Sequence, residues 1–130
     1  MERTKRQLSK YRDMEWKSER AKEVIRECNE AMTRLQGFSD SPIVQGGENR
    51  REELLASCID RKQGAEEAIA FMKWMNDALD RLDDEEKQIL YLYYIDKEGI
   101  RAVTRMLRCS KQTAYRRANK ALNRLDSLLF

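Results

Sequence analysis

The chain has 130 residues, of which 38% are charged and 41% are hydrophobic, and its formal net charge is +3. A single proline and five glycines favour long helices over a sheet-rich fold. With no histidine and three widely spaced cysteines, the sequence argues against an enzyme, a metal centre or a disulfide framework, and we expect no cofactor. No apolar run is long enough to cross a membrane and the start lacks a signal-peptide pattern, so a cytoplasmic protein is expected.

The first predicted helix covers residues 2–36. Its apolar and small residues follow the 3–4 spacing of a coiled-coil seam, namely Tyr11, Met14, Ser18, Ala21, Ile25, Cys28, Met32 and Leu35. Gly37 and Pro42 favour a helix end and a loop near residues 37–47. A second helix, from about residue 48 to 81, has a wider apolar stripe. It repeats the 3–4 spacing at Leu54, Cys58, Arg61, Ala65, Ala68, Met72, Met75, Leu79 and Leu82. Residues 1–81 are therefore predicted to form a long antiparallel, coiled-coil-like helical hairpin for assembly or partner binding.

Residues 82–130 are predicted to form three shorter helices. The first begins at Asp83, with Glu86 three residues later as in a capping box, and ends near residues 96–99. The second covers about residues 99–107, and the turn Arg108-Cys109-Ser110 leads to the third, about residues 111–128, with Ser110 as its N-cap. Two helices joined by so tight a turn predict a helix-turn-helix. The expected fold is all-α, a helical hairpin followed by a three-helix helix-turn-helix domain.

The basic charge of the chain is concentrated at its end. Residues 100–130 hold eight basic residues and one acidic residue, Asp126, which gives this stretch a charge of +7. Segregation of this kind favours a polyanion such as double-stranded DNA, read in the major groove by the last helix. The predicted base-reading residues are Lys111, Gln112, Tyr115, Arg116 and Asn119. The predicted backbone contacts are Arg101, Arg105, Arg108, Ser110, Thr113, Arg117, Lys120 and Arg124.

Residues 82–125 resemble region 4 of the sigma-70 class. The resemblance rests on the acidic cap after Leu82, Ile89-Leu90 with Tyr93-Tyr94, the pattern Leu107-x-x-Ser110-x-x-Thr113-Ala114, the basic helix and Ala121-Leu122. Two positions depart from that class. Ala102-Val103-Thr104 stands where a Glu-Ile-Ala-like triplet is usual, and Arg108 replaces the turn glycine. Arg108 therefore either adopts a left-handed conformation at some energetic cost, or the turn has a different geometry.

The whole chain is similar to small phage and prophage regulators of Gram-positive bacteria, the ArpU/RinA-like late-gene activators and their uncharacterised relatives. The similarity rests on Tyr11-Arg12-Asp13-Met14-Glu15-Trp16-Lys17, on Pro42 with Gly46-Gly47, and on the sigma-like end. It implies a transcriptional activator of phage or mobile-element late genes that acts in the bacterial host cytoplasm.

A sequence-specific transcriptional regulator is therefore the leading hypothesis for the function. A single helix-turn-helix reads few base pairs, so the hairpin is expected either to form a homodimer or to contact RNA polymerase. Two alternatives belong to other classes of protein. One is a DNA-packaging component such as a small terminase subunit, and the other is a coiled-coil interaction protein that does not bind DNA.

Overall fold

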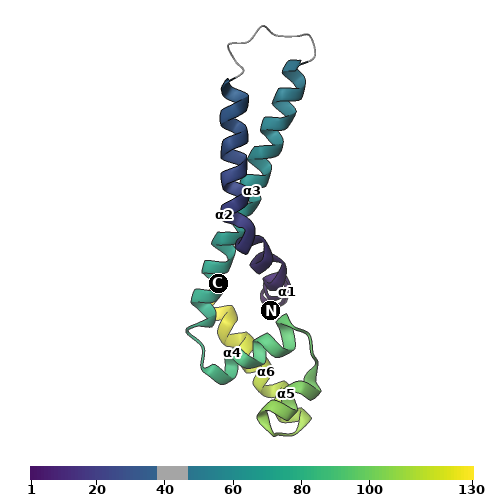
Figure 1. Ribbon diagram of the computed structural model, residues 1–130. Helices are drawn as coiled ribbons and strands as arrows, with labels where there is room; N and C mark the ends of the chain where they lie inside the picture. The colour runs from purple at the N-terminus through teal and green to yellow at the C-terminus, as the bar shows by residue number, and fades with distance from the viewer. Residues whose placement is uncertain (38–46) are drawn as a thin grey trace. The chain divides into compact units, whose positions relative to one another are not determined.

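The structure is a computed structural model that describes residues 1–37 and 47–130. Every regular element in these two ranges is a helix, which confirms the predicted all-α class. The elements in chain order are α1 (Glu2–Ser9), α2 (Tyr11–Gly37), α3 (Gly47–Leu79), α4 (Asp84–Leu90), the π-helical turn η2 (Tyr91–Ile95), α5 (Ile100–Leu107) and α6 (Lys111–Leu129) (Figure 1). Within the described ranges, no helix combines the length and the apolar character needed to span a bilayer. The predicted loop near residues 37–47, with Pro42 and Gly46, lies outside the described residues except at its ends.

The helices form two compact units. The central unit is Glu15–Phe71, and the terminal unit combines Met1–Met14 with Met72–Phe130. The terminal unit thus differs in its bounds from the predicted domain of residues 82–130. It also contains the start of the chain and the last two turns of α3.

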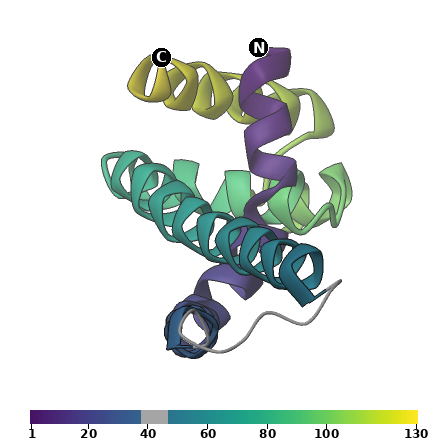
Figure 2. The ribbon, with the colours of Figure 1, turned by 90° about the horizontal axis from the view of Figure 1, so that it is seen from above.

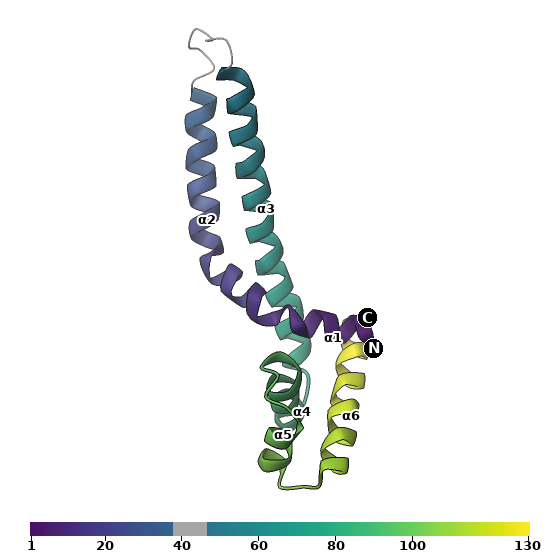
Figure 3. The ribbon, with the colours of Figure 1, turned by 90° about the vertical axis from the view of Figure 1, so that its right-hand side faces the viewer.

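In the central unit, α2 and α3 run antiparallel (Figures 1 and 3). Both helices bury small residues of their predicted seams, among them Ala21, Cys28, Cys58, Ala65 and Ala68. An ion pair between Arg61 Nη2 and Glu27 Oε2, at 3.7 Å, joins the two helices. Larger apolar side chains of α3, including Leu54, Ile59 and Ile69, are exposed.

The prediction of one continuous helix over residues 2–36 is wrong, because the helix is interrupted at Lys10. The Lys10 amide donates to the Gln7 carbonyl, three residues back, at 3.2 Å. Beside it, the Ser9 hydroxyl donates to the carbonyl of Arg6 at 2.7 Å, a back-bond of the kind that bends helices. The interruption makes α1 a separate helix, which packs on α6 and η2 within the terminal unit (Figures 2 and 3).

The terminal unit buries side chains from both ends of the chain. Around α4, α5 and α6 the buried cluster is Ile89, Ile100, Val103, Ala114 and Ala118. Leu8 of α1 and Met75 and Leu79 of α3 are also fully buried. The hydroxyl of Tyr11 donates to Asn76 Oδ1 at 2.7 Å and lies 2.9 Å from the hydroxyl of Tyr91. These contacts make α1 and the end of α3 parts of this unit.

The start of α4 differs from the predicted capping box. Asp83 occupies the N-cap position, but its side chain makes no capping hydrogen bond. The carboxylates of Asp83 and Glu86 instead accept from Arg124 of α6. The predicted box is wrong because a guanidinium from another helix takes the place of the backbone amides as the partner of both acids.

The helix that begins with α4 does not remain α-helical to its end, because it continues as the π-helical turn η2. The amide of Asp96 donates to the carbonyl of Tyr91, five residues earlier, at 2.8 Å. Lys97, with φ 52°, and Gly99, with φ 93°, then reverse the chain into α5. This left-handed geometry suits a glycine at position 99.

Candidate nucleic-acid interface

The turn between α5 and α6 contains a left-handed arginine. Arg108 has φ 53° and ψ 49°, which decides between the two geometries left open by the sequence. Ser110 caps α6 as predicted, because its hydroxyl oxygen accepts from the Thr113 amide at 3.2 Å. The same hydroxyl lies 2.9 Å from Thr113 Oγ1. The turn and the Ser110 cap therefore fix where α6 begins.

The two faces of α6 differ sharply in chemistry. Its buried residues are Ala114, Ala118, Ala121, Leu122 and Leu125. All five predicted base-reading residues, Lys111, Gln112, Tyr115, Arg116 and Asn119, are exposed. Their spacing places them on one side of the helix. Tyr115 is 43% exposed and its ring meets the edge of Tyr93, with centroids 6.4 Å apart. The buried face thus holds the helix in place while the polar face remains accessible.

The predicted backbone contacts fall into three groups. Arg101 and Arg105 on α5, Arg108 in the turn and Lys120 on α6 are exposed. Ser110 and Thr113 form the cap of α6, and Thr113 is half-buried. Arg117 and Arg124 form ion pairs inside the terminal unit.

These two arginines link α6 to the acidic start of α4. Arg117 Nη1 lies 2.8 Å from Glu85 Oε1, and both side chains are about half exposed. Arg124 Nη1 contacts Asp83 Oδ2 at 3.4 Å and also pairs with Glu86 Oε1. The side chain of Glu86 is only 12% exposed. Arg117 and Arg124 therefore have acidic partners within the terminal unit, which the basic pattern of the sequence did not indicate.

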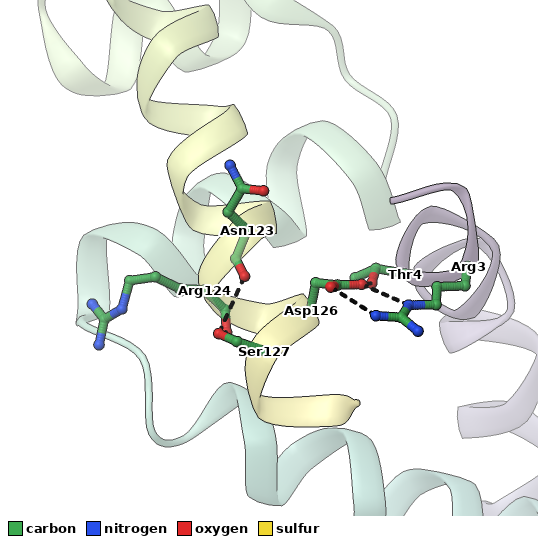
Figure 4. A network of polar contacts seen from close by, with 6 residues as sticks. All are labelled: Arg3, Thr4, Asn123, Arg124, Asp126 and Ser127. Carbon is green, nitrogen blue, oxygen red and sulfur yellow. Dashed lines mark hydrogen bonds and ion pairs between the residues drawn. The ribbon is translucent and has the colours of Figure 1, made fainter.

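The single acid of the basic stretch anchors α1. Asp126 accepts two hydrogen bonds from Arg3, each at 3.1 Å, and one from the hydroxyl of Thr4 (Figure 4). These hydrogen bonds, that of Arg3 first, lower the pKa of Asp126 to about 2, so the carboxylate stays charged at neutral pH. The guanidinium of Arg3 also lies 4.4 Å from the ring centroid of Phe130. Arg124 points to the opposite side of α6 (Figure 4).

Sequence reasoning missed α1 as a neighbour of α6. The one available signal was Asp126 itself, an acid that stands alone among eight basic residues. Its partners lie more than 120 residues away in the chain, and nothing in the local pattern identifies them.

The part of the chain that the structure describes is all-α, and its last helix, which exposes basic side chains, follows a short helix through a capped turn. The chain belongs to the DUF1492 family, described as a protein of unknown function, whose model matches residues 36–126. The match covers α3 to α5 and most of α6, and it does not include α1. No curated protein and no solved structure matches the chain.

Replacing Arg108 by glycine is expected to separate stability from binding. Glycine adopts the left-handed conformation without the steric cost of a Cβ atom, so Arg108→Gly should stabilise the fold by up to about 1 kcal/mol. The same change removes an exposed cation and, under the DNA-binding role expected from the sequence, should also weaken binding to DNA. Chemical denaturation and binding titrations on the same preparation measure both effects. A lower unfolding free energy for Arg108→Gly would contradict the strain assigned to Arg108. Arg105→Gly, inside α5, is the comparison and should be destabilising by about 1 kcal/mol.

Proposed function

We propose that the protein is a sequence-specific DNA-binding regulator of transcription, with α5 and α6 as a helix-turn-helix. The observation that carries the proposal is the division of α6 into a buried apolar face and an exposed face of amides and cations. An isolated basic helix has no fixed position. Here α6 is held by its packing on α4 and α5 and by the Ser110 cap.

The exposed side chains of α6 match the chemistry of base edges. Gln112 can form two hydrogen bonds with adenine, and Arg116 can do so with guanine O6 and N7. Lys120, Arg105 and Arg108 are exposed cations on α6, α5 and the turn, suited to phosphates on either side of the groove. This distribution of side chains favours a complex in which the first half of α6 lies in the major groove of a DNA duplex.

The resemblance to ArpU/RinA-like activators supports a more specific proposal, an activator of phage or mobile-element late genes. Such a protein needs a second half-site or a polymerase contact to gain specificity. The exposed apolar side chains of the central unit, such as Leu54, Ile59 and Ile69, support a role for that unit in contacting a second copy or RNA polymerase.

The proposal is tested first by selecting bound duplexes from a random pool with the wild-type protein. Against the selected site, Arg116→Ala should lose about 1–3 kcal/mol of binding free energy and relax the preference at one base pair. The reason is that the variant lacks the Arg116 guanidinium, so the two hydrogen bonds proposed to guanine are lost. Titrations of the selected site and of single-base variants measure both quantities.

Lys120→Ala is the matched comparison on the same helix. It should weaken binding to all sequences about equally and reduce the dependence of affinity on salt. If selection yields no enriched sequence and Arg116→Ala binds like wild type, α6 is not the reading helix. Absence of DNA binding at low salt would favour the coiled-coil interaction protein instead.

A further inference from the structure

An open groove lies beside the reading face of α6, between three elements of the terminal unit. We call it the α1 groove. Lys5 and Arg6 of α1, Tyr93 of η2, Lys97 and, from α6, Tyr115 and Asn119 line it. None of the first four was among the DNA contacts expected from the sequence.

The groove has the chemistry of an anion site. Lys5, Arg6 and Lys97 are exposed cations from two separate segments of the chain. Tyr93 and Tyr94, whose rings meet edge to face at 4.7 Å, add hydroxyl donors to the lining. Burial raises the pKa of Tyr94 above its usual value, which keeps its hydroxyl protonated. The one acid of the lining, Glu2, is 82% exposed and lies 3.8 Å from Lys5.

The groove is continuous with the candidate reading face. Tyr115 and Asn119 belong to both, and Asn119 also lines a second hollow on α6 with Arg116 and Lys120. A ligand seated on the reading face therefore extends directly into the groove. A duplex presents a phosphate backbone at each edge of its major groove, so backbone is the part of the ligand that reaches this position.

The position of α1 is fixed rather than incidental. Leu8 and Thr4 are fully buried, and Asp126 of α6 holds Arg3 and Thr4. Lys5 and Arg6 follow directly in the same helix. The cations of α1 are thus carried on a helix that α6 itself anchors.

We propose that the α1 groove binds the sugar–phosphate backbone of the DNA duplex whose bases α6 reads, with Lys5, Arg6 and Lys97 neutralising its phosphates. This inference rests on the proposed function. It extends the proposed DNA-binding surface from the helix-turn-helix to α1, which begins at Glu2, whereas α5 begins at Ile100.

The test is the salt dependence of DNA binding by the full chain, measured by fluorescence anisotropy with a labelled duplex of about 30 base pairs. The double variant Lys5→Gln/Arg6→Gln should lower the slope of log affinity against log salt by about two and weaken binding roughly 10- to 100-fold. Base preference at the selected site should not change. The control Lys22→Gln/Arg26→Gln removes the same charge from exposed positions of α2 in the central unit and should keep the wild-type slope.

Circular dichroism establishes whether the double variant folds. If it does not fold, the variant Lys97→Asn tests the proposal instead, because asparagine tolerates the positive φ of Lys97. This change should lower the slope of log affinity against log salt by about one. If the double variant folds, the groove proposal is overturned when its salt slope equals that of the control. If the double variant does not fold, the proposal is overturned when the salt slope of Lys97→Asn equals that of the control. If Arg116→Ala still relaxes base preference in that case, only the groove proposal fails. If the wild-type protein has no affinity for DNA at low salt, both proposals fail.

Discussion

Leu8→Ala is expected to destabilise the terminal unit by about 2–5 kcal/mol, although residue 8 lies far in sequence from the helices that the unit was predicted to contain. The Leu8 side chain is fully buried, and α1 contacts both α6 and η2. Truncation to alanine removes this packing and leaves a cavity that the surrounding helices fill only in part. Thermal unfolding followed by circular dichroism should show a lower midpoint, by roughly 10 °C or more.

Leu54→Ala is the matched comparison, since it makes the same truncation at a site that is 47% exposed. It should change the unfolding midpoint little, because alanine favours the helix and little apolar surface leaves water. Equal midpoints for the two variants would mean that α1 does not stabilise the terminal unit.

Features of the terminal unit that depend on near neighbours could be predicted from the sequence. Ser110 and Thr113 are three residues apart, so the cap of α6 is encoded locally and was predicted correctly. Because Arg108 stands where a turn glycine is usual, the sequence left two geometries of the turn open, and the structure shows the left-handed one. Alternating buried and exposed positions along α6 follow directly from the 3.6-residue period of a helix.

Features that depend on distant partners could not be predicted in the same way. Tyr11 and Met14 carry the 3–4 pattern to within one residue of Lys10, so the pattern gives no sign of the break there. The break is stabilised by tertiary contacts, such as that of Arg3 with Asp126, which local periodicity does not encode. The same reason explains why the sequence did not indicate the bounds of the two compact units. The 3–4 pattern of α3 continues through Met72 and Met75, whereas contacts assign these residues to the terminal unit.

The capping box failed for a related reason, and it leads to the second large expected effect. The sequence Asp83-Asp84-Glu85-Glu86 fits a helix start, but Glu86 is nearly buried and accepts from Arg124 of α6. Its second oxygen, Oε2, is buried and has no hydrogen-bond partner among the described residues. The carboxylate therefore depends on one guanidinium for its compensation.

Arg124→Ala should accordingly destabilise the terminal unit by about 1–3 kcal/mol, because it leaves Glu86 nearly buried without its partner. Lys120→Ala, one turn earlier on α6, removes an equal charge from an exposed position and should leave stability almost unchanged. Chemical denaturation of both variants measures the difference. Adding Glu86→Gln to Arg124→Ala should restore part of the lost stability, since a neutral amide costs less to bury than a carboxylate.

The same two variants separate a structural arginine from one that contacts DNA. If Arg124 mainly joins α4 to α6, Arg124→Ala lowers stability, while only Lys120→Ala reduces the salt dependence of DNA binding without loss of stability. If Arg124 mainly grips phosphate, the two variants should be equally stable and should show equal losses in salt slope. That second result would mean that the ion pairs with Asp83 and Glu86 contribute little to the fold, and that Arg124 exchanges them for DNA phosphates at little cost.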